Sequence, residues 1–171
     1  MISAEVETAE LVTEGRLGEL YVRHAPGALS LAYLLTGERA LAEDLVQEAF
    51  TKLAARFLDL RAPEAFDAYL RKTVVNLARS HFRHKRVERA YLDRVGGRPE
   101  AEAFQPDVDQ KEALREALLQ LSERQRTAIV LRFYADLSEA QTAKVLGCRV
   151  GTVKSLVSRG MSKLRVEVRD E

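Results

Sequence analysis

The sequence has no tryptophan, one cysteine and no long uninterrupted run of apolar residues. A membrane-spanning helix needs about 20 such residues, and the acidic N-terminal segment lacks the basic-then-apolar pattern of a signal peptide. We therefore expect a cytoplasmic chain with no membrane insertion. The lone Cys148 has no partner for an intrachain disulfide. Aromatic residues make up only 6% of the chain, and Val, Ile and Thr rarely alternate with polar residues, which excludes an all-β fold.

What the sequence does contain favours helices. Of its 171 residues, 46% are apolar and 31% are charged, and strong helix formers (Leu, Ala, Arg and Glu) dominate. Periodic apolar positions fall into two blocks, separated by residues 91–110, which are rich in Gly, Pro and acidic residues. We predict an all-α protein of two small helical domains, at 11–90 and 111–168, joined by a flexible acidic linker.

The first domain is predicted to contain three helices. Apolar residues recur three or four apart in three stretches, at about 14–35, 38–58 and 65–90. We expect Pro26 to kink or split the first helix, because proline removes a backbone N–H. Gly37 should end this helix, because glycine readily adopts the left-handed conformation of a helix stop.

Charge is sorted along the chain although the formal net charge is only +1. Residues 1–60 carry five Lys/Arg against ten Asp/Glu, and residues 90–140 carry seven against ten. By contrast, residues 71–89 and 141–169 each carry seven Lys/Arg against a single Glu. Two separate basic segments suggest two contacts with a polyanion. The alternative is that these segments pair with the acidic segments inside the protein, and charge alone does not decide between the two.

The second domain carries the pattern of a helix-turn-helix. Ser138 is placed to cap a short helix that contains the small Ala143, and Gly147 follows where a turn needs a positive φ. Val150, Val153 and Val157 would form the inner face of the second helix, with support from upstream apolar residues that include Ile129 and Phe133. The exposed helix of such a module enters the major groove of DNA. The residues that would face the DNA are Arg149, Thr152, Lys154, Ser155, Ser158 and Arg159.

Three stretches together resemble a known family. Residues 42–50 (AEDLVQEAF), 68–80 (AYLRKTVVNLARS) and 121–138, the last running into 151–155 (GTVKS), are similar to regions 2.2, 2.4 and 4 of bacterial RNA polymerase sigma factors. Their order and the acidic linker between them resemble the extracytoplasmic-function (ECF, group IV) sigma factors, the actinobacterial sigma-E family above all. The resemblance covers residues 14–166.

The resemblance implies partners and roles. Core RNA polymerase, through its β′ and β subunits, would be held by Asp44, Gln47 and Glu48. The melted −10 element would be held by Arg61, Phe66, Arg71, Lys72, Asn76, Arg79 and Arg83. In this set the loop 60–66 would trap a flipped base, and the cations would hold phosphates. The −35 element would be read by the helix-turn-helix. An anti-sigma protein that masks one of these surfaces is a further hypothesis.

Other functions fit the sequence less well. A stand-alone helix-turn-helix regulator with an N-terminal ligand- or partner-binding domain would leave the first basic segment and residues 42–50 without a role. An enzyme is not indicated, because the sequence has no nucleophile–base pair, metal-ligand cluster or Gly-rich phosphate loop. We expect no cofactor and no metal. His81 and His84 are more simply explained as surface histidines of a basic helix than as metal ligands.

Overall fold

The computed structural model describes residues 2–57, 65–95 and 110–167, and within these residues it contains helices and no strand. The N-terminal half consists of α1 (Ile2–Thr36), α2 (Arg39–Phe57) and α3 (Phe66–Val95). The C-terminal half consists of α4 (Gln110–Leu119), α5 (Glu123–Ile129), the π-helical turn η2 (Val130–Tyr134), α6 (Glu139–Leu146) and α7 (Val150–Glu167). The all-α fold with two helical units is confirmed. Most of the predicted linker lies outside the described residues.

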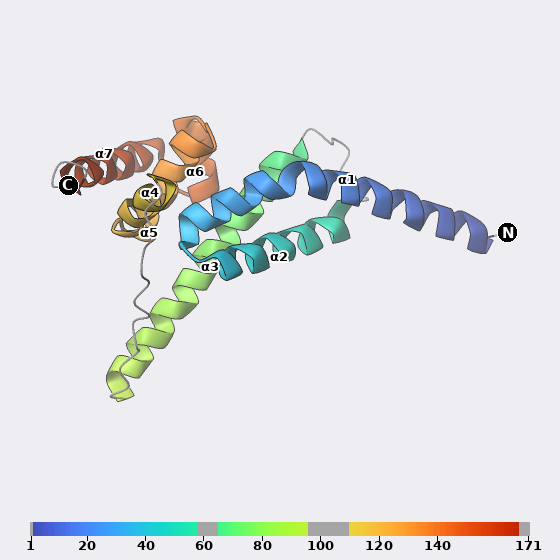
Figure 1. Cartoon of the computed structure of the whole chain (residues 1–171), viewed down its shortest axis with the longest axis horizontal. Coiled ribbons are helices and arrows are strands. Elements are labelled where there is room, and N and C mark those ends of the chain that lie inside the picture. Colours follow the sequence, from blue (N-terminus) through green and yellow to red (C-terminus); the bar gives the residue numbers. More distant parts are fainter. Residues whose placement is uncertain (1, 58–64, 96–109, 168–171) are drawn as a thin grey trace.

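The three N-terminal helices pack around one core. In Figure 1, α1 and α2 run side by side, and α3 crosses them before its last turns project away from the body. The core between them is apolar and almost fully buried, with Leu31, Leu35, Ala49, Phe66, Leu70 and Val74 among its members. These residues recur three or four apart, so one stripe of each helix is buried while the opposite stripe stays free.

Two predictions were made for α1, one at Pro26 and one at Gly37. The helix continues through Pro26, so the predicted split does not occur, although Figure 1 shows that the axis of α1 bends along its length. Proline deprives the carbonyl of Val22 of its usual donor, and the Val22 side chain is 77% exposed, so that side of the helix faces water. The predicted helix end is confirmed, because Gly37 has φ +73° and donates its N–H to the Tyr33 carbonyl at 2.7 Å.

Both predicted cap residues of the helix-turn-helix, Ser138 and Gly147, cap α6. Ser138 caps α6 by accepting a hydrogen bond from the Gln141 N–H at 3.1 Å, and the Gln141 side chain accepts the Ser138 N–H in return. Gly147 ends α6 with φ +62°. The buried Ala143 and Val153 then join α6 to α7 in the C-terminal core. Helix α7 is therefore held by a short, well-capped helix.

Two predicted inward residues point outward. Phe133 is 61% exposed and Val150 is 38% exposed. Phe133 is exposed because it lies in η2, where the Ala135 N–H donates to the Val130 carbonyl, five residues back. This wider turn rotates the following side chains away from the face expected for an α-helix. Val150 begins α7, and the next turn, at Val153, supplies the buried contact.

The two halves contact each other. Helix α1 touches α4, α5 and η2, and α3 touches α5. In Figure 1 the C-terminal helices lie against the end of α1 and the middle of α3. The sequence predicted two tethered units but gave no indication of this contact.

Candidate nucleic-acid and protein interfaces

The outer face of α2 carries the polar residues that were predicted to bind protein. Asp44, Gln47 and Glu48 are all exposed, whereas Leu45 and Ala49 of the same helix are buried. The 3.6-residue repeat of the helix produces this separation. Glu48 also pairs with Lys52 one turn later, at 2.7 Å. The structure therefore brings the three residues together on one solvent-facing surface.

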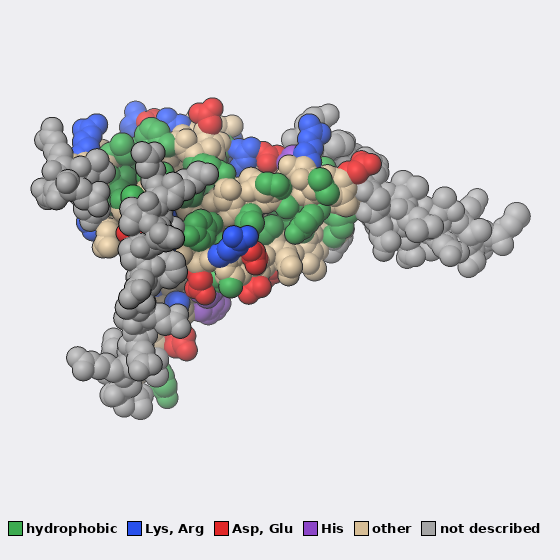
Figure 2. All heavy atoms as spheres, in the orientation of Figure 1, with side chains coloured by type: hydrophobic (Ala, Val, Ile, Leu, Met, Phe, Trp, Pro, Cys, Tyr) green, Lys and Arg blue, Asp and Glu red, His purple; other side chains and the backbone are tan. Residues whose placement is uncertain are grey.

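An apolar groove adjoins this polar face, and the sequence did not reveal it. It has a volume of about 460 Å³ and lies between α1 and α2. Its lining includes Tyr21, Val22, Pro26, Leu29, Val46 and Gln47. Tyr21 remains 45% exposed although its ring centroid lies 4.8 Å from that of Phe50. Figure 2 shows apolar side chains exposed along α1 and α2 with acidic side chains beside them. Such a groove beside carboxylates can accept apolar side chains of a basic partner.

The outer face of α3 gathers most of the residues predicted for the −10 element. Lys72, Asn76 and Arg83 are exposed, and Arg79 is half-buried. Their spacing of four, three and four residues places them on one stripe of the helix. Arg61 lies outside the described residues.

Phe66 does not belong to this surface. It is fully buried, with its ring centroid 5.7 Å from that of Phe50 and 5.4 Å from that of His24. The prediction that Phe66 touches DNA is therefore wrong for this structure. As the first residue of α3, its side chain turns into the core and anchors the helix.

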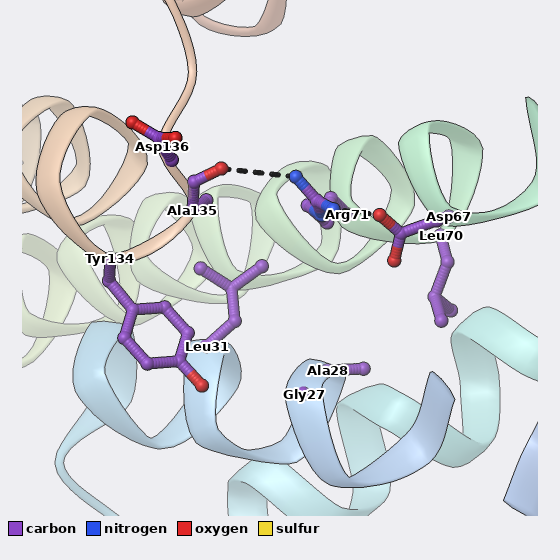
Figure 3. Close-up of a pocket in the computed structure, with 9 residues that line it drawn as sticks. All are labelled: Gly27, Ala28, Leu31, Asp67, Leu70, Arg71, Tyr134, Ala135 and Asp136. Carbon is purple, nitrogen blue, oxygen red and sulfur yellow. Dashed lines mark hydrogen bonds and ion pairs between the residues drawn. The ribbon is translucent and has the colours of Figure 1, made fainter. Parts of the chain in front are cut away.

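Arg71 lies at the centre of a polar cluster at the base of α3. It forms an ion pair with Asp67, and its Nη1 donates to the backbone carbonyl of Ala135 at 3.1 Å. Asp67 in turn lies 3.4 Å from Nδ1 of His24. Burial, helped by the nearby Arg23 and Arg71 cations, nevertheless holds the pKa of His24 below its usual value. Figure 3 shows Arg71 between Asp67 of its own helix and Ala135 of the C-terminal half.

Other arginines join the same two halves. Arg79 donates to the carbonyl of Leu146 at 3.2 Å, and Arg115 donates to the carbonyl of Gly37 at 3.0 Å. Arg126 is buried against the ring of Phe82, with 5.3 Å between its guanidinium carbon and the ring centroid. Burial lowers the pKa of Arg126. Sequence patterns missed these contacts because their acceptors are mainly backbone carbonyls.

The helix α7 presents the residues predicted for the −35 element. Lys154, Ser155, Ser158 and Arg159 are exposed along one face, Arg149 is exposed just before the helix, and Thr152 is half-buried. Lys154 lies 3.6 Å from Glu139 of α6. Arg159 donates from Nε to the Ser155 carbonyl at 3.3 Å, which holds the side chain along the helix. Hydroxyl and cationic donors of this kind can contact base edges or phosphates in a groove.

Two features are absent from the residues that the structure describes. No group of three or more His, Cys, Asp or Glu side chains there is arranged to hold a metal ion. None of the helices described is long and apolar enough to cross a membrane.

A helical unit with one acidic and one basic face, followed by a capped helix-turn-helix, defines a DNA-binding transcription protein. Residues 20–88 match the family profile "Sigma-70 region 2", and residues 111–164 match "Sigma-70, region 4". The chain belongs to the ECF group of sigma-70-type RNA polymerase sigma factors. Members of this family are transcription initiation factors rather than enzymes. A stand-alone regulator is not favoured, because both halves match the family in the expected order.

The chain is similar to several known members. It is 31% identical to the RNA polymerase sigma-E factor of Streptomyces coelicolor over 88% of this chain and 85% of that one. It is 33% identical to the ECF sigma factor EcfG of Rhodopseudomonas palustris over 81% and 77% of the two chains. A co-crystal structure of the sigma factor RpoE in complex with the anti-sigma factor NepR, from Bartonella quintana, matches with a TM-score of 0.72 and 28% identity over 89% and 96% of the two chains.

Proposed function

We propose that this chain binds core RNA polymerase through α2, holds the opened −10 element on α3 and reads the −35 element with α7. The observation that carries the proposal is the arrangement of three exposed polar surfaces on three helices. One surface is acidic and lies beside an apolar groove, and the other two are basic. Their order along the chain follows the matches to regions 2 and 4.

The polymerase contact rests on α2. Asp44, Gln47 and Glu48 offer acceptors to a basic partner, and the neighbouring groove offers apolar area. In protein interfaces a few central contacts carry most of the affinity, and complementary charges orient the partners and speed their association. The partner surface would be a helix or helix pair of the β′ subunit, with β contacting other parts of the chain.

The DNA contacts rest on α3 and α7. On α3, Arg71, Lys72, Arg79 and Arg83 would bind phosphates of the opened strand, and Asn76 would contact an unstacked base. On α7, Lys154, Ser155, Ser158 and Arg159 would face the −35 groove, with Arg149 and Thr152 on the backbone. Arg61, which lies outside the described residues, would add a further cation to the −10 contacts.

An anti-sigma protein is the expected regulator. The support comes from the RpoE structure, which holds the anti-sigma factor NepR. The α2 face and its apolar groove combine exposed carboxylates with apolar side chains, and such a partner could use both. An inhibitor bound there would compete directly with polymerase.

The test is binding to core RNA polymerase. We expect the parent chain to form a stable complex on a native gel and the double variant Gln47→Ala/Glu48→Ala to lose it. The matched control is Glu19→Ala, which removes another exposed carboxylate, from α1. Because these side chains are exposed, folding should be unaffected, and circular dichroism should verify this. Equal binding by all variants would show that the polymerase contact does not depend on Gln47 and Glu48. If neither the parent nor any variant binds core polymerase, the proposal is refuted.

A further inference from the structure

We propose that the chain carries a binding site for a polyphosphate chain, the group that nucleoside triphosphates and inorganic polyphosphate share. The site is a cleft of about 570 Å³ between the middle of α3 and the C-terminal half (Figure 1). We call it the arginine cleft, because four guanidinium groups line it: those of Arg79, Arg83, Arg86 and Arg124. The effect of a ligand on the −10 surface rests on the proposed function of α3, whereas the site itself does not.

The lining of the arginine cleft is rich in hydrogen-bond donors. On α3, Asn76 and Ser80 accompany the three arginines, and Arg124 of α5 belongs to the opposite wall. The α3 residues recur three or four apart, so they lie on one stripe of the helix. A guanidinium carries five N–H donors and no acceptor, and it binds phosphate oxygens in pairs. The lining therefore suits an anion that has many oxygen acceptors.

Three of the four guanidinium groups are available to a ligand. Arg83, Arg86 and Arg124 are exposed, and none of these side chains forms a hydrogen bond or an ion pair with another residue that the structure describes. Like charges three or four residues apart on a helix repel one another. A bound polyanion would remove this repulsion between Arg83 and its neighbours Arg79 and Arg86.

Arg79 joins the two walls of the arginine cleft. Its Nη1 donates to the carbonyl of Leu146, the last residue of α6, at 3.2 Å. This bond uses one of the five guanidinium donors, so the others remain for a ligand. Gly147 follows in the same wall, and a Cβ placed on it would meet nothing within 4 Å. The cleft is therefore formed by contacts within the chain and is open beside Gly147.

The balance of charge selects a chain of phosphates over a single phosphate. The one carboxylate of the lining, Glu123, lies near the buried cation of Arg126, which offsets part of its charge. Four cations therefore face a ligand against one carboxylate. A phosphate monoester carries at most about two negative charges. A chain of three phosphates carries more charge and can reach arginines of both walls at once.

A bound polyphosphate would compete with the opened DNA strand. Asn76, Arg79 and Arg83 belong both to the arginine cleft and to the proposed −10 surface. Arg86 and Arg124 line the cleft but belong to none of the proposed DNA or polymerase surfaces. These two residues therefore allow the site to be tested while the proposed contacts are kept.

The test is isothermal titration calorimetry of the full-length chain with sodium tripolyphosphate, without divalent cations. We expect Arg86→Gln/Arg124→Gln to bind at least about tenfold more weakly than the parent, because two charged hydrogen-bond donors are lost. Glu123→Gln, which removes the repelling carboxylate, should bind about threefold more tightly. The matched control is Arg89→Gln, which removes an exposed arginine of α3 that does not line the cleft and should bind like the parent. Circular dichroism should verify that all variants fold.

The ligand's chemistry is tested with three further probes. ATP and GTP should bind about as tightly as tripolyphosphate, because no aromatic side chain is among the described residues that line the cleft. Inorganic phosphate should bind at least about tenfold more weakly, since it engages fewer arginines. An equal loss in Arg89→Gln, or unchanged affinity in Arg86→Gln/Arg124→Gln, would overturn the proposal. A strong preference for one nucleotide over tripolyphosphate would overturn the assignment to the phosphate chain.

Competition with DNA separates this inference from the proposed function. Tripolyphosphate should displace a mixed-sequence single-stranded oligonucleotide from the parent, and Arg86→Gln/Arg124→Gln should require about tenfold more of it. If the parent binds no oligonucleotide, the proposed role of α3 is wrong, but calorimetry still decides whether the cleft binds polyphosphate. If the parent binds the oligonucleotide but not tripolyphosphate, the site is wrong and the proposed function stands.

Discussion

Replacing Gly160 by alanine tests how α7 is packed against α5. Gly160 is buried in the middle of α7, and a Cβ there would lie 2.6 Å from Cδ1 of Ile129 and 3.4 Å from Cβ of Gln125, both on α5. Alanine is favoured over glycine within a helix by about 1 kcal/mol. An extra methyl forced into a packed core costs about 1–3 kcal/mol. We therefore expect Gly160→Ala to lower the free energy of unfolding by about 1 kcal/mol, the difference between these two effects.

Shortening Ile129 should reverse the effect of the alanine at Gly160. Ile129→Val removes the Cδ1 atom and alone should cost about 1 kcal/mol. Added to that variant, Gly160→Ala should become stabilising, which gives a coupling free energy of about 2 kcal/mol between the two sites. Urea unfolding followed by circular dichroism measures all four proteins of the cycle. Gly151→Ala is the control in α7, because its Cβ would meet nothing within 4 Å. Effects that add to within about 0.5 kcal/mol would refute the proposed contact.

Two further predictions concern a cap and a titrating group. Ser138→Ala should lower the unfolding free energy by about 1 kcal/mol, because it removes the acceptor for the Gln141 N–H; Ser138→Asp, which restores an acceptor, should recover most of the loss. Burial and the neighbouring Arg23 and Arg71 keep the pKa of His24 below 6.5, so the unfolded chain takes up this proton first as the pH falls. The parent should therefore lose stability as the pH drops through 6.5, down to the lowered pKa of the folded form. His24→Gln should lack this pH-dependent loss of unfolding free energy when unfolding curves are measured across the same pH range. An identical pH dependence in both proteins would show that His24 is not the group responsible.

The sequence predicted the elements whose signals are local. The caps of α6, Ser138 and Gly147, lie where residue chemistry required them, because a hydroxyl acceptor and a tolerated positive φ are properties of single residues. The buried stripe of α3 also followed from spacing alone, since Leu70 and Val74 recur one helical turn apart. The exposed polar residues of α2 followed from the same periodicity.

The predictions that failed depended on geometry beyond the local repeat. Phe133 points outward because a π-helical turn changes the number of residues per turn, and no residue type marks that change. Phe66 was assigned to DNA by position, but an aromatic side chain at the start of α3 gains more from the core formed with Phe50. Pro26 is tolerated because the affected side of α1 faces water.

The contact between the two halves shows why charge patterns alone could not settle the role of α3. The sequence left two alternatives for its basic segment, a polyanion outside the chain or acidic partners within it. In the structure Arg71 and Arg79 use neither for their contacts across the halves: their acceptors there are backbone carbonyls at helix ends. Every chain has backbone carbonyls at its helix ends, so the residue types do not reveal them as acceptors. Their partial negative charge nevertheless attracts the same guanidinium groups that bind phosphate. The guanidinium groups of α3 therefore suit phosphates and helix ends alike, and charge patterns cannot distinguish between these two kinds of acceptor.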